Sequence, residues 1–216
     1  NNAICVSLHA SFLSCVGSDG AAISQNFAPV TAIVREPFTR WALVSPRGAK
    51  QIISIASAGD CLLAADSSRV YFQQGIYAVA SSLLAGTYTD YVKGFERVRA
   101  AMTNPIEVEI PCEEFRSAVR RARVSCGPDS SGIDFNWTTG ELTLTAAAER
   151  GASSVKLPVA YLDDPVKLRM PGDRLLSALS LVPDTDVLKI TFMNNDVSVF
   201  FESGMFLALT GTMDLV

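Results

Sequence analysis

The sequence predicts an α+β protein built from two similar domains, each with helices packed on one face of an antiparallel sheet. The first observation is an internal repeat, because residues 68–81, SRVYFQQGIYAVAS, resemble residues 197–210, VSVFFESGMFLALT, at an offset of 129 residues. Both copies carry β-branched and aromatic residues around a short turn that ends in Gly75 or Gly204, which is the pattern of a β-hairpin. The second observation is that the same offset relates residues 3–6 to 132–135 and 13–16 to 142–145. A register kept over several elements indicates a tandem duplication.

Size and composition are those of a folded protein. The chain has 216 residues, of which 49% are hydrophobic and 19% charged, and this length allows two domains of about 100 residues. The net charge of −4 argues against a surface covered by nucleic acid but permits a local basic face. No run long and apolar enough for a membrane span and no secretion leader are visible. The five cysteines are scattered, so we expect a reduced, cytoplasmic protein, no membrane partner and cysteines that act as small buried apolar residues.

In the first domain, residues 1–90, a turn is expected at 17–20 because Gly, Ser and Asp cluster there. Ser45 and Pro46 predict the N-cap and first residue of a helix that ends near residue 56. Strands are expected at 3–8, 12–16, 23–34 with an interruption at Pro29, 41–44 and 60–65, before the hairpin at 68–81.

Residues 91–105 are expected to be a linker, followed by the second domain at 106–216. The alternating sequence IEVEI at 106–110 predicts a half-buried strand. The next helix, 112–124, has an apolar face made by Phe115, Ala118, Val119 and Ala122. Strands at 133–136, 141–146, 154–159, 166–170 and 187–192, and a helix at 171–182, complete the domain before its hairpin. The repeated unit is therefore a strand, a helix and three strands, taken twice.

The first domain is expected to be incomplete. Ala3 corresponds to Gly132, so the first copy has no counterpart of residues 106–131. That piece would hold a strand and a helix, and we expect it to belong to a longer chain of which this is a part.

Signatures of catalysis are weak. His9 is the only histidine, which excludes a multi-histidine metal site, and it is expected in an exposed loop. The carboxylates in Asp163-Asp164 and in Glu113-Glu114 are sequence neighbours, so they point apart and do not form a two-carboxylate site. No phosphate-binding loop, dinucleotide fingerprint or zinc-ligand spacing is present. We expect no enzyme activity, no cofactor and no metal.

The distinctive charge feature lies on the helix at 112–124. Arg116, Arg120 and Arg123 recur at i, i+4 and i+7, and Arg121 adds a fourth positive charge. Basic residues recur on the other helices as Arg47, Lys50 and Arg174. This pattern fits either an ordinary solvated face or a surface that binds phosphates without sequence preference. In a chain that is acidic overall, it suggests basic helices on one side and an acidic sheet on the other.

Four segments together resemble the bacterial sliding clamp, the β subunit of DNA polymerase III. Cys15-Val16-Gly17-Ser18-Asp19-Gly20 is similar to the family's T-D-G-H-R-L segment, and Val44-Ser45-Pro46-Arg47-Gly48 to its V-P-R-K-G helix start. Gly86-Thr87-Tyr88-Thr89-Asp90-Tyr91 is similar to its G-x-F-P-D-Y linker, and the terminal hairpin ends near Met213. The resemblance covers essentially the whole chain as the family's second and third domains.

The resemblance implies tandem domains of the DNA-clamp, or processivity, fold in a ring around double-stranded DNA. Family members have three such domains per chain and pair head to tail as a homodimer, with helices lining the hole and sheets outside. The clamp slides on the duplex and tethers the polymerase, which suits weak, sequence-independent phosphate contacts. The DNA-contacting residues would be Arg47, Lys50, Arg116, Arg120, Arg121, Arg123 and Arg174.

The family also binds linear peptides of polymerases and of clamp-loader subunits in a pocket between its second and third domains. The matching positions are Ser18, Gly20, Ala21, Ile23, Thr89, Lys93, Gly94, Leu209, Thr210 and Gly211. Several depart from the family pattern: Ala21 replaces His, Thr89 replaces Pro, Lys93 replaces Arg, and residues 209–212, LTGT, replace M-P-M-R. The apolar floor of Ile23 and Leu209 remains, which predicts a pocket for an apolar peptide end with altered preference. The alternative is a divergent clamp-fold scaffold that binds proteins and forms no ring on DNA.

Overall fold

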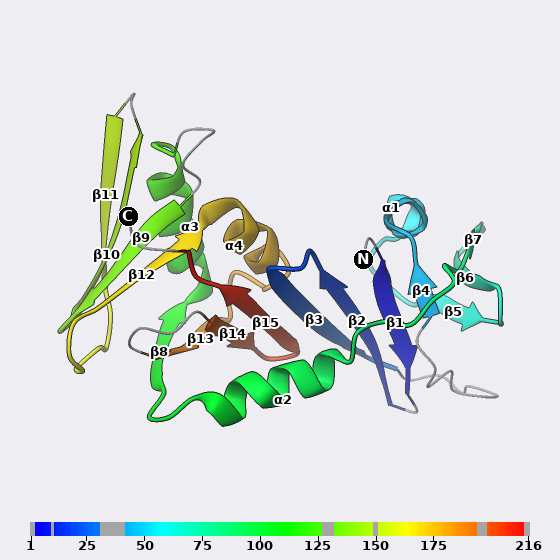
Figure 1. Cartoon of the computed structure of the whole chain (residues 1–216). Helices are drawn as coiled ribbons and strands as arrows, with labels where there is room; N and C mark the ends of the chain where they lie inside the picture. The colour runs from blue at the N-terminus through cyan, green and yellow to red at the C-terminus, as the bar shows by residue number, and fades with distance from the viewer. Residues whose placement is uncertain are drawn as a thin grey trace. The chain divides into compact units, whose positions relative to one another are not determined.

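The computed structural model describes residues 3–9, 11–30, 42–126, 132–148, 151–193 and 198–213. The chain divides into two compact units, Asn1–Asp90 and Tyr91–Val216. Their elements are labelled in Figure 1.

The described residues of the first unit form two antiparallel sheets and one helix. Its strands are β1 (Ile4–Leu8), β2 (Phe12–Ser18), β3 (Ala22–Pro29), β4 (Ala42–Val44), β5 (Leu62–Ala65), β6 (Arg69–Gln74) and β7 (Tyr77–Ser82), and its helix is α1 (Pro46–Ile55). The strand orders are β4-β1-β2-β3 and β5-β6-β7. The expected strand at 23–34 is described only to Pro29, because residues 31–41 lie outside the described part of the chain.

Local signals explain α1. The Ser45 hydroxyl accepts a hydrogen bond from the Gly48 backbone N–H at 3.0 Å, and Pro46 occupies the first turn. A serine N-cap satisfies a donor that the helix leaves unpaired, and proline at this position loses no helical hydrogen bond. The sequence-based prediction of this helix start is confirmed.

The second unit repeats the arrangement and holds additional elements. Its helices are α2 (Tyr91–Ala101), α3 (Cys112–Arg123) and α4 (Gly172–Leu179). Its strands are β8 (Ile106–Pro111), β9 (Gly132–Thr138), β10 (Glu141–Ala148), β11 (Gly151–Pro158), β12 (Val166–Pro171), β13 (Val187–Phe192), β14 (Ser198–Ser203) and β15 (Phe206–Gly211). They form antiparallel sheets in the orders β11-β10-β9-β12 and β15-β14-β13-β8. From β8 onward, the order of strand, helix and three strands, taken twice, is as predicted.

The duplication is visible in the first and last residues of equivalent strands. Strands β3, β6 and β7 begin and end 129 residues before β11, β14 and β15. Gly75 and Gly204 close the two hairpins with φ of 58° and 51°, a region that favours glycine because it lacks a Cβ. The hairpin prediction is confirmed in both units.

Four local expectations differ from the structure. The stretch expected as a linker includes helix α2, whose Phe95 is buried and packs near Phe200 of β14 with ring centroids 6.1 Å apart. Helix α4 ends at Leu179 rather than near Val182. His9 is half-buried and stacks on Phe12 at 4.2 Å, and Cys61 is exposed rather than buried.

The main core of the second unit lies between α3, α4 and the two sheets. Phe115, Ala118, Val119 and Ala122 on α3 are fully buried with Phe135 of β9 and Phe201 of β14. The remaining described free cysteines are buried or half-buried, and burial raises the pKa of the Cys5 thiol to about 12. Within the described residues, no helix is both long and apolar enough to cross a membrane.

Candidate nucleic-acid interface and peptide-binding residues

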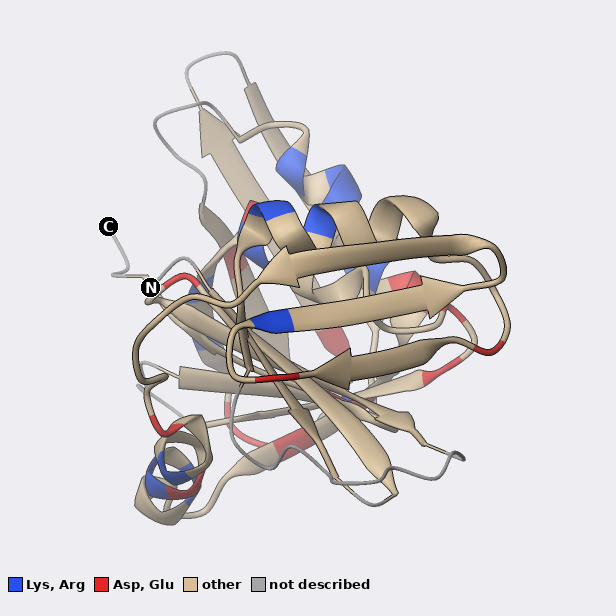
Figure 2. Cartoon of the chain, turned by 90° about the vertical axis from the view of Figure 1, so that its right-hand side faces the viewer, with Lys and Arg blue, Asp and Glu red and all other residues tan. Residues whose placement is uncertain are grey.

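The helices present six of the seven predicted basic residues to solvent. Arg47 and Lys50 on α1, Arg120, Arg121 and Arg123 on α3, and Arg174 on α4 are all exposed. Figure 2 shows Lys and Arg in blue along the helices. These side chains are long and flexible, which suits contacts to phosphates.

Arg116 is not part of this surface, and its prediction as a DNA-contacting residue is wrong. Its side chain is buried and donates hydrogen bonds to the carbonyl oxygens of Leu179 (2.7 Å) and Val182, and it forms an ion pair with Asp184. The reason is geometric: residue 116 lies on the side of α3 that faces the end of α4, next to the apolar face. Arg116 therefore joins α3 to the last residue of α4, Leu179, and to Val182 in the turn that follows it.

Two of the exposed arginines are partly neutralised by acidic residues. Arg123 forms an ion pair with Asp173 of α4, and this pair raises the pKa of the Arg123 guanidinium. Arg120 lies 4.0 Å from a carboxylate oxygen of Glu113. Within the described part of the chain, Arg47, Lys50 and Arg121 form no ion pair, so they offer the strongest positive charge to an anion.

The sheet faces turned away from the helices carry mixed charges, whereas the sequence suggested an acidic sheet. Lysines pair with acidic residues on neighbouring strands as Lys189–Glu107 (2.8 Å), Lys156–Glu141 (2.9 Å) and Lys167–Asp134 (3.2 Å). Successive strand residues point to opposite faces, so these pairs lie opposite the buried residues Leu188, Leu157 and Leu168. The difference in charge between the helices and the sheets is therefore smaller than expected.

The first unit contributes four of the predicted peptide-binding residues in one hairpin turn. Ser18 of β2 pairs with Ile23 of β3, and Gly20 has φ of 90°. The Asp19 carboxylate accepts hydrogen bonds from the backbone N–H groups of Ala21 and Ala22 at 3.0 and 2.8 Å. The turn holds the exposed Ala21 and the half-buried Ile23 in a fixed conformation.

The second unit contributes Lys93 and Gly94 on α2 and residues 209–211 on β15. Leu209 is half-buried and pairs with Phe200, the residue beside which Phe95 of α2 packs. Thr210 points to the opposite face, where it is buried, so its side chain cannot line a pocket with Leu209. Thr89 is exposed just before α2 and belongs to the first unit.

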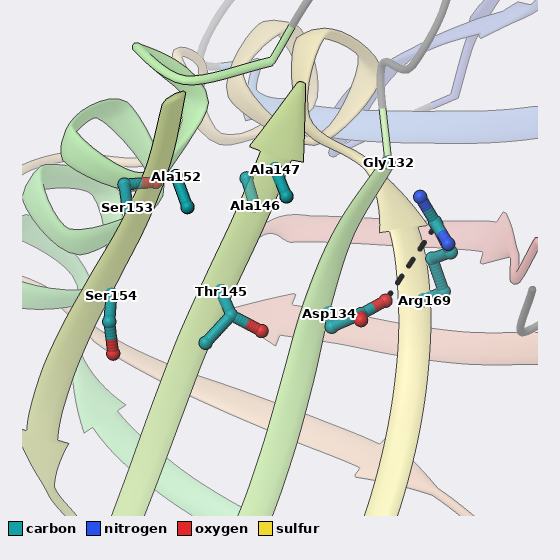
Figure 3. Close-up of a pocket in the computed structure, with 9 residues that line it drawn as sticks. All are labelled: Gly132, Asp134, Thr145, Ala146, Ala147, Ala152, Ser153, Ser154 and Arg169. Carbon is teal, nitrogen blue, oxygen red and sulfur yellow. Dashed lines mark ion pairs between the residues drawn. The ribbon is translucent and has the colours of Figure 1, made fainter. Parts of the chain in front are cut away.

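A cavity of about 380 Å³ lies on the β11-β10-β9-β12 sheet, and none of its lining residues was predicted (Figure 3). Its polar side combines Asp134 of β9 and Arg169 of β12, which form an ion pair at 3.7 Å. Its lining comes from four strands: Gly132, Asp134, Thr145, Ala146, Ala147, Ala152, Ser153, Ser154 and Arg169. The only sequence signal is the polar half of each alternating strand, which does not reveal which residues meet across the sheet.

The described residues were also compared with the requirements of a metal site. Among the described residues, no group of three or more His, Cys, Asp or Glu side chains lies close enough to hold a metal ion.

The comparisons agree on the fold: the chain has the fold of DNA sliding clamps. Three bacterial structures that it resembles illustrate this. A sliding clamp from Pseudomonas aeruginosa superimposes with a TM-score of 0.83 at 16% identity, and the match covers 99% of this chain and 58% of that one. The DNA polymerase III β subunit from Borrelia burgdorferi, solved with a natural product, gives 0.80 at 15% identity, covering 100% and 57%. The Bartonella birtlesii sliding clamp, bound to griselimycin, gives 0.80 at 16% identity, covering 99% and 58%.

These matches confirm the predicted fold. The chain spans less than two thirds of the length of the clamps that it matches. No protein-family model matches the sequence, and no curated protein does.

Proposed function

We propose that this chain forms the second and third domains of a DNA sliding clamp, a non-catalytic accessory protein that encircles double-stranded DNA and tethers a polymerase. The observation that carries the proposal is the clamp fold over 99% of the chain, at a TM-score of 0.83. The helices of both units carry exposed basic residues, which supports contact with duplex DNA. The ring would be a homodimer in the full-length protein.

In this proposal, Arg47, Lys50 and Arg121 make the main phosphate contacts, and Arg120, Arg123 and Arg174 make weaker ones. Phosphate contacts depend on charge and carry no sequence information, so the protein moves along DNA while it stays bound. A closed ring holds the protein on DNA by topology. Few strong contacts are then needed, which is consistent with an acidic chain and with arginines partly neutralised by acidic neighbours.

The test is retention on DNA. The full-length protein is loaded on nicked circular duplex, the complex is isolated at high salt, and the DNA is then linearised. Retention on the circle with release after linearisation is the expected result. Loss at high salt before linearisation, or retention that linearisation does not change, would overturn the ring.

A charge variant separates surface contacts from topology. Replacing Arg47, Lys50 and Arg121 by Ala should weaken the binding of linear duplex at low salt and reduce the salt dependence of that binding. In the matched control, Ala replaces Lys156, Lys167 and Lys189, which lie on sheet faces away from the helices. This control variant should bind linear duplex as the parent protein does. Equal loss in both variants would mean that only net charge matters.

The tethering step would use the predicted peptide-binding residues, with the side chains of Ile23 and Leu209 as the apolar floor. Fluorescence titration with a polymerase tail peptide should give saturable binding that Leu209→Asp abolishes and Thr210→Val, at a buried position, leaves intact. Absence of saturable binding would show that the peptide-binding function of these residues is lost.

The second candidate is a divergent clamp-fold scaffold that binds proteins and forms no ring on DNA. Two observations favour it: Arg120 and Arg123 have acidic partners, and the residues at 209–212 depart from the resembled pattern, with Thr210 buried. The linearisation experiment distinguishes the two candidates.

A further inference from the structure

A row of polar residues crosses the outer face of the β11-β10-β9-β12 sheet, where the cavity lies. Asp134 of β9 is opposite Arg169 of β12 on one side and Thr145 of β10 on the other, and Thr145 is opposite Ser154 of β11. The next residue of β9, Phe135, is fully buried, so the side chains of the row point away from the core. All four residues of the row line the same cavity (Figure 3).

Small residues keep the space beside this row open. Ala147 and Ala152 are two residues away from Thr145 and Ser154 along their strands, on the same face of the sheet, and they are opposite each other. Both are exposed. The cavity of about 380 Å³ has a size typical of sites for small ligands. Larger side chains at these two positions would fill it.

The position of Arg169 leaves its charged end available to a ligand. A Cβ on Gly132 would collide with Nε of Arg169, so glycine allows the guanidinium to lie against the β9 backbone. The ion pair with Asp134 is made through Nε, at 3.7 Å from Oδ1. Among the described residues, none accepts a hydrogen bond from the two Nη groups, which can bind a carboxylate through two parallel hydrogen bonds.

Asp134 adds a second requirement. Its Oδ2 lies 3.2 Å from Nζ of Lys167, whereas its Oδ1 is buried and has no hydrogen-bond partner in the described part of the chain. A buried acceptor without a donor is unfavourable, so a ligand that brings a donor would be stabilised there. Lys167, Arg169 and Asp134 together carry one net positive charge. The site therefore favours a negatively charged group that has a hydrogen-bond donor next to it.

We propose that this cavity binds an α-carboxylate whose α-carbon carries an N–H group, as at the C-terminus of a peptide or in a free amino acid. The carboxylate would bind the Nη groups of Arg169, and the N–H would donate to Oδ1 of Asp134. A small side chain would lie over Ala147 and Ala152. The cavity is on a different sheet from residues 209–211 of β15, and the proposal does not depend on DNA binding or on the tethering of a polymerase.

A titration followed by nuclear magnetic resonance of the 216-residue chain tests this proposal. The probes are N-acetyl-L-alanine, which mimics a peptide C-terminus, L-alanine, and N-acetyl-L-alaninamide, which lacks the carboxylate. We expect saturable shifts of the backbone amide signals of Gly132, Thr145 and Ala152 with a carboxylate probe and none with the amide. Tighter binding of N-acetyl-L-alanine would identify a peptide C-terminus as the ligand, and tighter binding of L-alanine would identify a free amino acid.

Two variants test the two parts of the site. Arg169→Gln should weaken binding at least about tenfold, because it removes the charged donors. Ala152→Leu fills the cavity and leaves every charge in place, and it should weaken binding to a similar degree, so the test does not depend on the folding of a single variant. Lys189→Gln, on the outer face of the other sheet, is the control and should bind as the parent protein does.

Three results would overturn the proposal. The first is the absence of saturable shifts with both carboxylate probes. The second is binding of N-acetyl-L-alaninamide or of acetate as tight as that of N-acetyl-L-alanine, which would show that the carboxylate or the N–H group is not recognised. The third is binding that neither Arg169→Gln nor Ala152→Leu weakens.

Discussion

At the residue scale, Arg116 shows that a position in a charged helical stripe does not fix a function. Its neighbours Arg120 and Arg121 are exposed, whereas Arg116 lies against the end of α4 and donates to two backbone carbonyls there. A buried guanidinium is stable only when its hydrogen bonds and charge are satisfied. We therefore assign Arg116 a structural role in joining α3 to α4.

This role predicts unequal effects of two similar substitutions. Arg116→Met should lower the free energy of unfolding by about 2–3 kcal/mol, because it removes the guanidinium donors to the Leu179 and Val182 carbonyls and the ion pair with Asp184; the exposure of Asp184 keeps the loss below that of a fully buried pair. Arg121→Met, on the exposed side of the same helix, should change it by less than about 0.5 kcal/mol. Urea denaturation followed by circular dichroism measures both. Equal stability of the two variants would contradict the structural role.

At the element scale, short helices depend on their caps because propensity alone does not hold a ten-residue helix together. Helix α1 has a serine cap, a proline in its first turn and a single buried residue, Gly48. A Cβ on Gly48 would lie 2.1 Å from the Ser81 hydroxyl oxygen of β7, so glycine allows the close packing of α1 on this strand.

The cap predicts a local loss of stability. Ser45→Ala should destabilise α1 by about 1 kcal/mol, since the Gly48 N–H loses its acceptor. Hydrogen exchange of the first-turn amides of α1 should increase accordingly. Ser54→Ala, which removes a hydroxyl bonded to the Gln51 carbonyl within the same helix, is the control and should leave exchange in the first turn unchanged. An equal effect of both variants would show that the cap does not hold the helix start.

At the scale of the whole molecule, the two units differ in the size of the hydrophobic core that their described residues form. The second unit has a continuous core that includes Trp137, Phe135 and Phe192. Within the described part of the first unit, the cluster around Val44 and Val70 is much smaller, and Ile53 of α1 is largely exposed. Buried apolar area is the main source of stability, so the second unit should be the more stable one.

Unfolding should therefore occur in two steps. Trp41→Phe leaves Trp137 as the sole tryptophan, and its fluorescence should change at a higher urea concentration than the first phase of the far-ultraviolet circular dichroism signal. The circular dichroism trace of the parent chain is the control for the substitution itself. One coincident transition in both signals would mean that the units unfold as a single cooperative body.

The sequence predicted the elements that depend on local pattern. The 129-residue register gave both hairpins, since alternation and a turn glycine act over a few neighbouring residues, and Ser45-Pro46 gave the start of α1. The sequence missed α2 because its weak apolar periodicity lies in a stretch that resembled a linker. It also missed the burial of Arg116 and Thr210 and the cavity at Asp134 and Arg169.

By itself, the sequence determined that this protein is a duplicated α+β chain with basic residues on its helices, because repeats, periodicity and caps are properties of neighbouring residues. Only the tertiary structure decided which of those basic residues reach solvent. Burial depends on what packs against a side chain, and the partners of Arg116 belong to elements far away in the sequence.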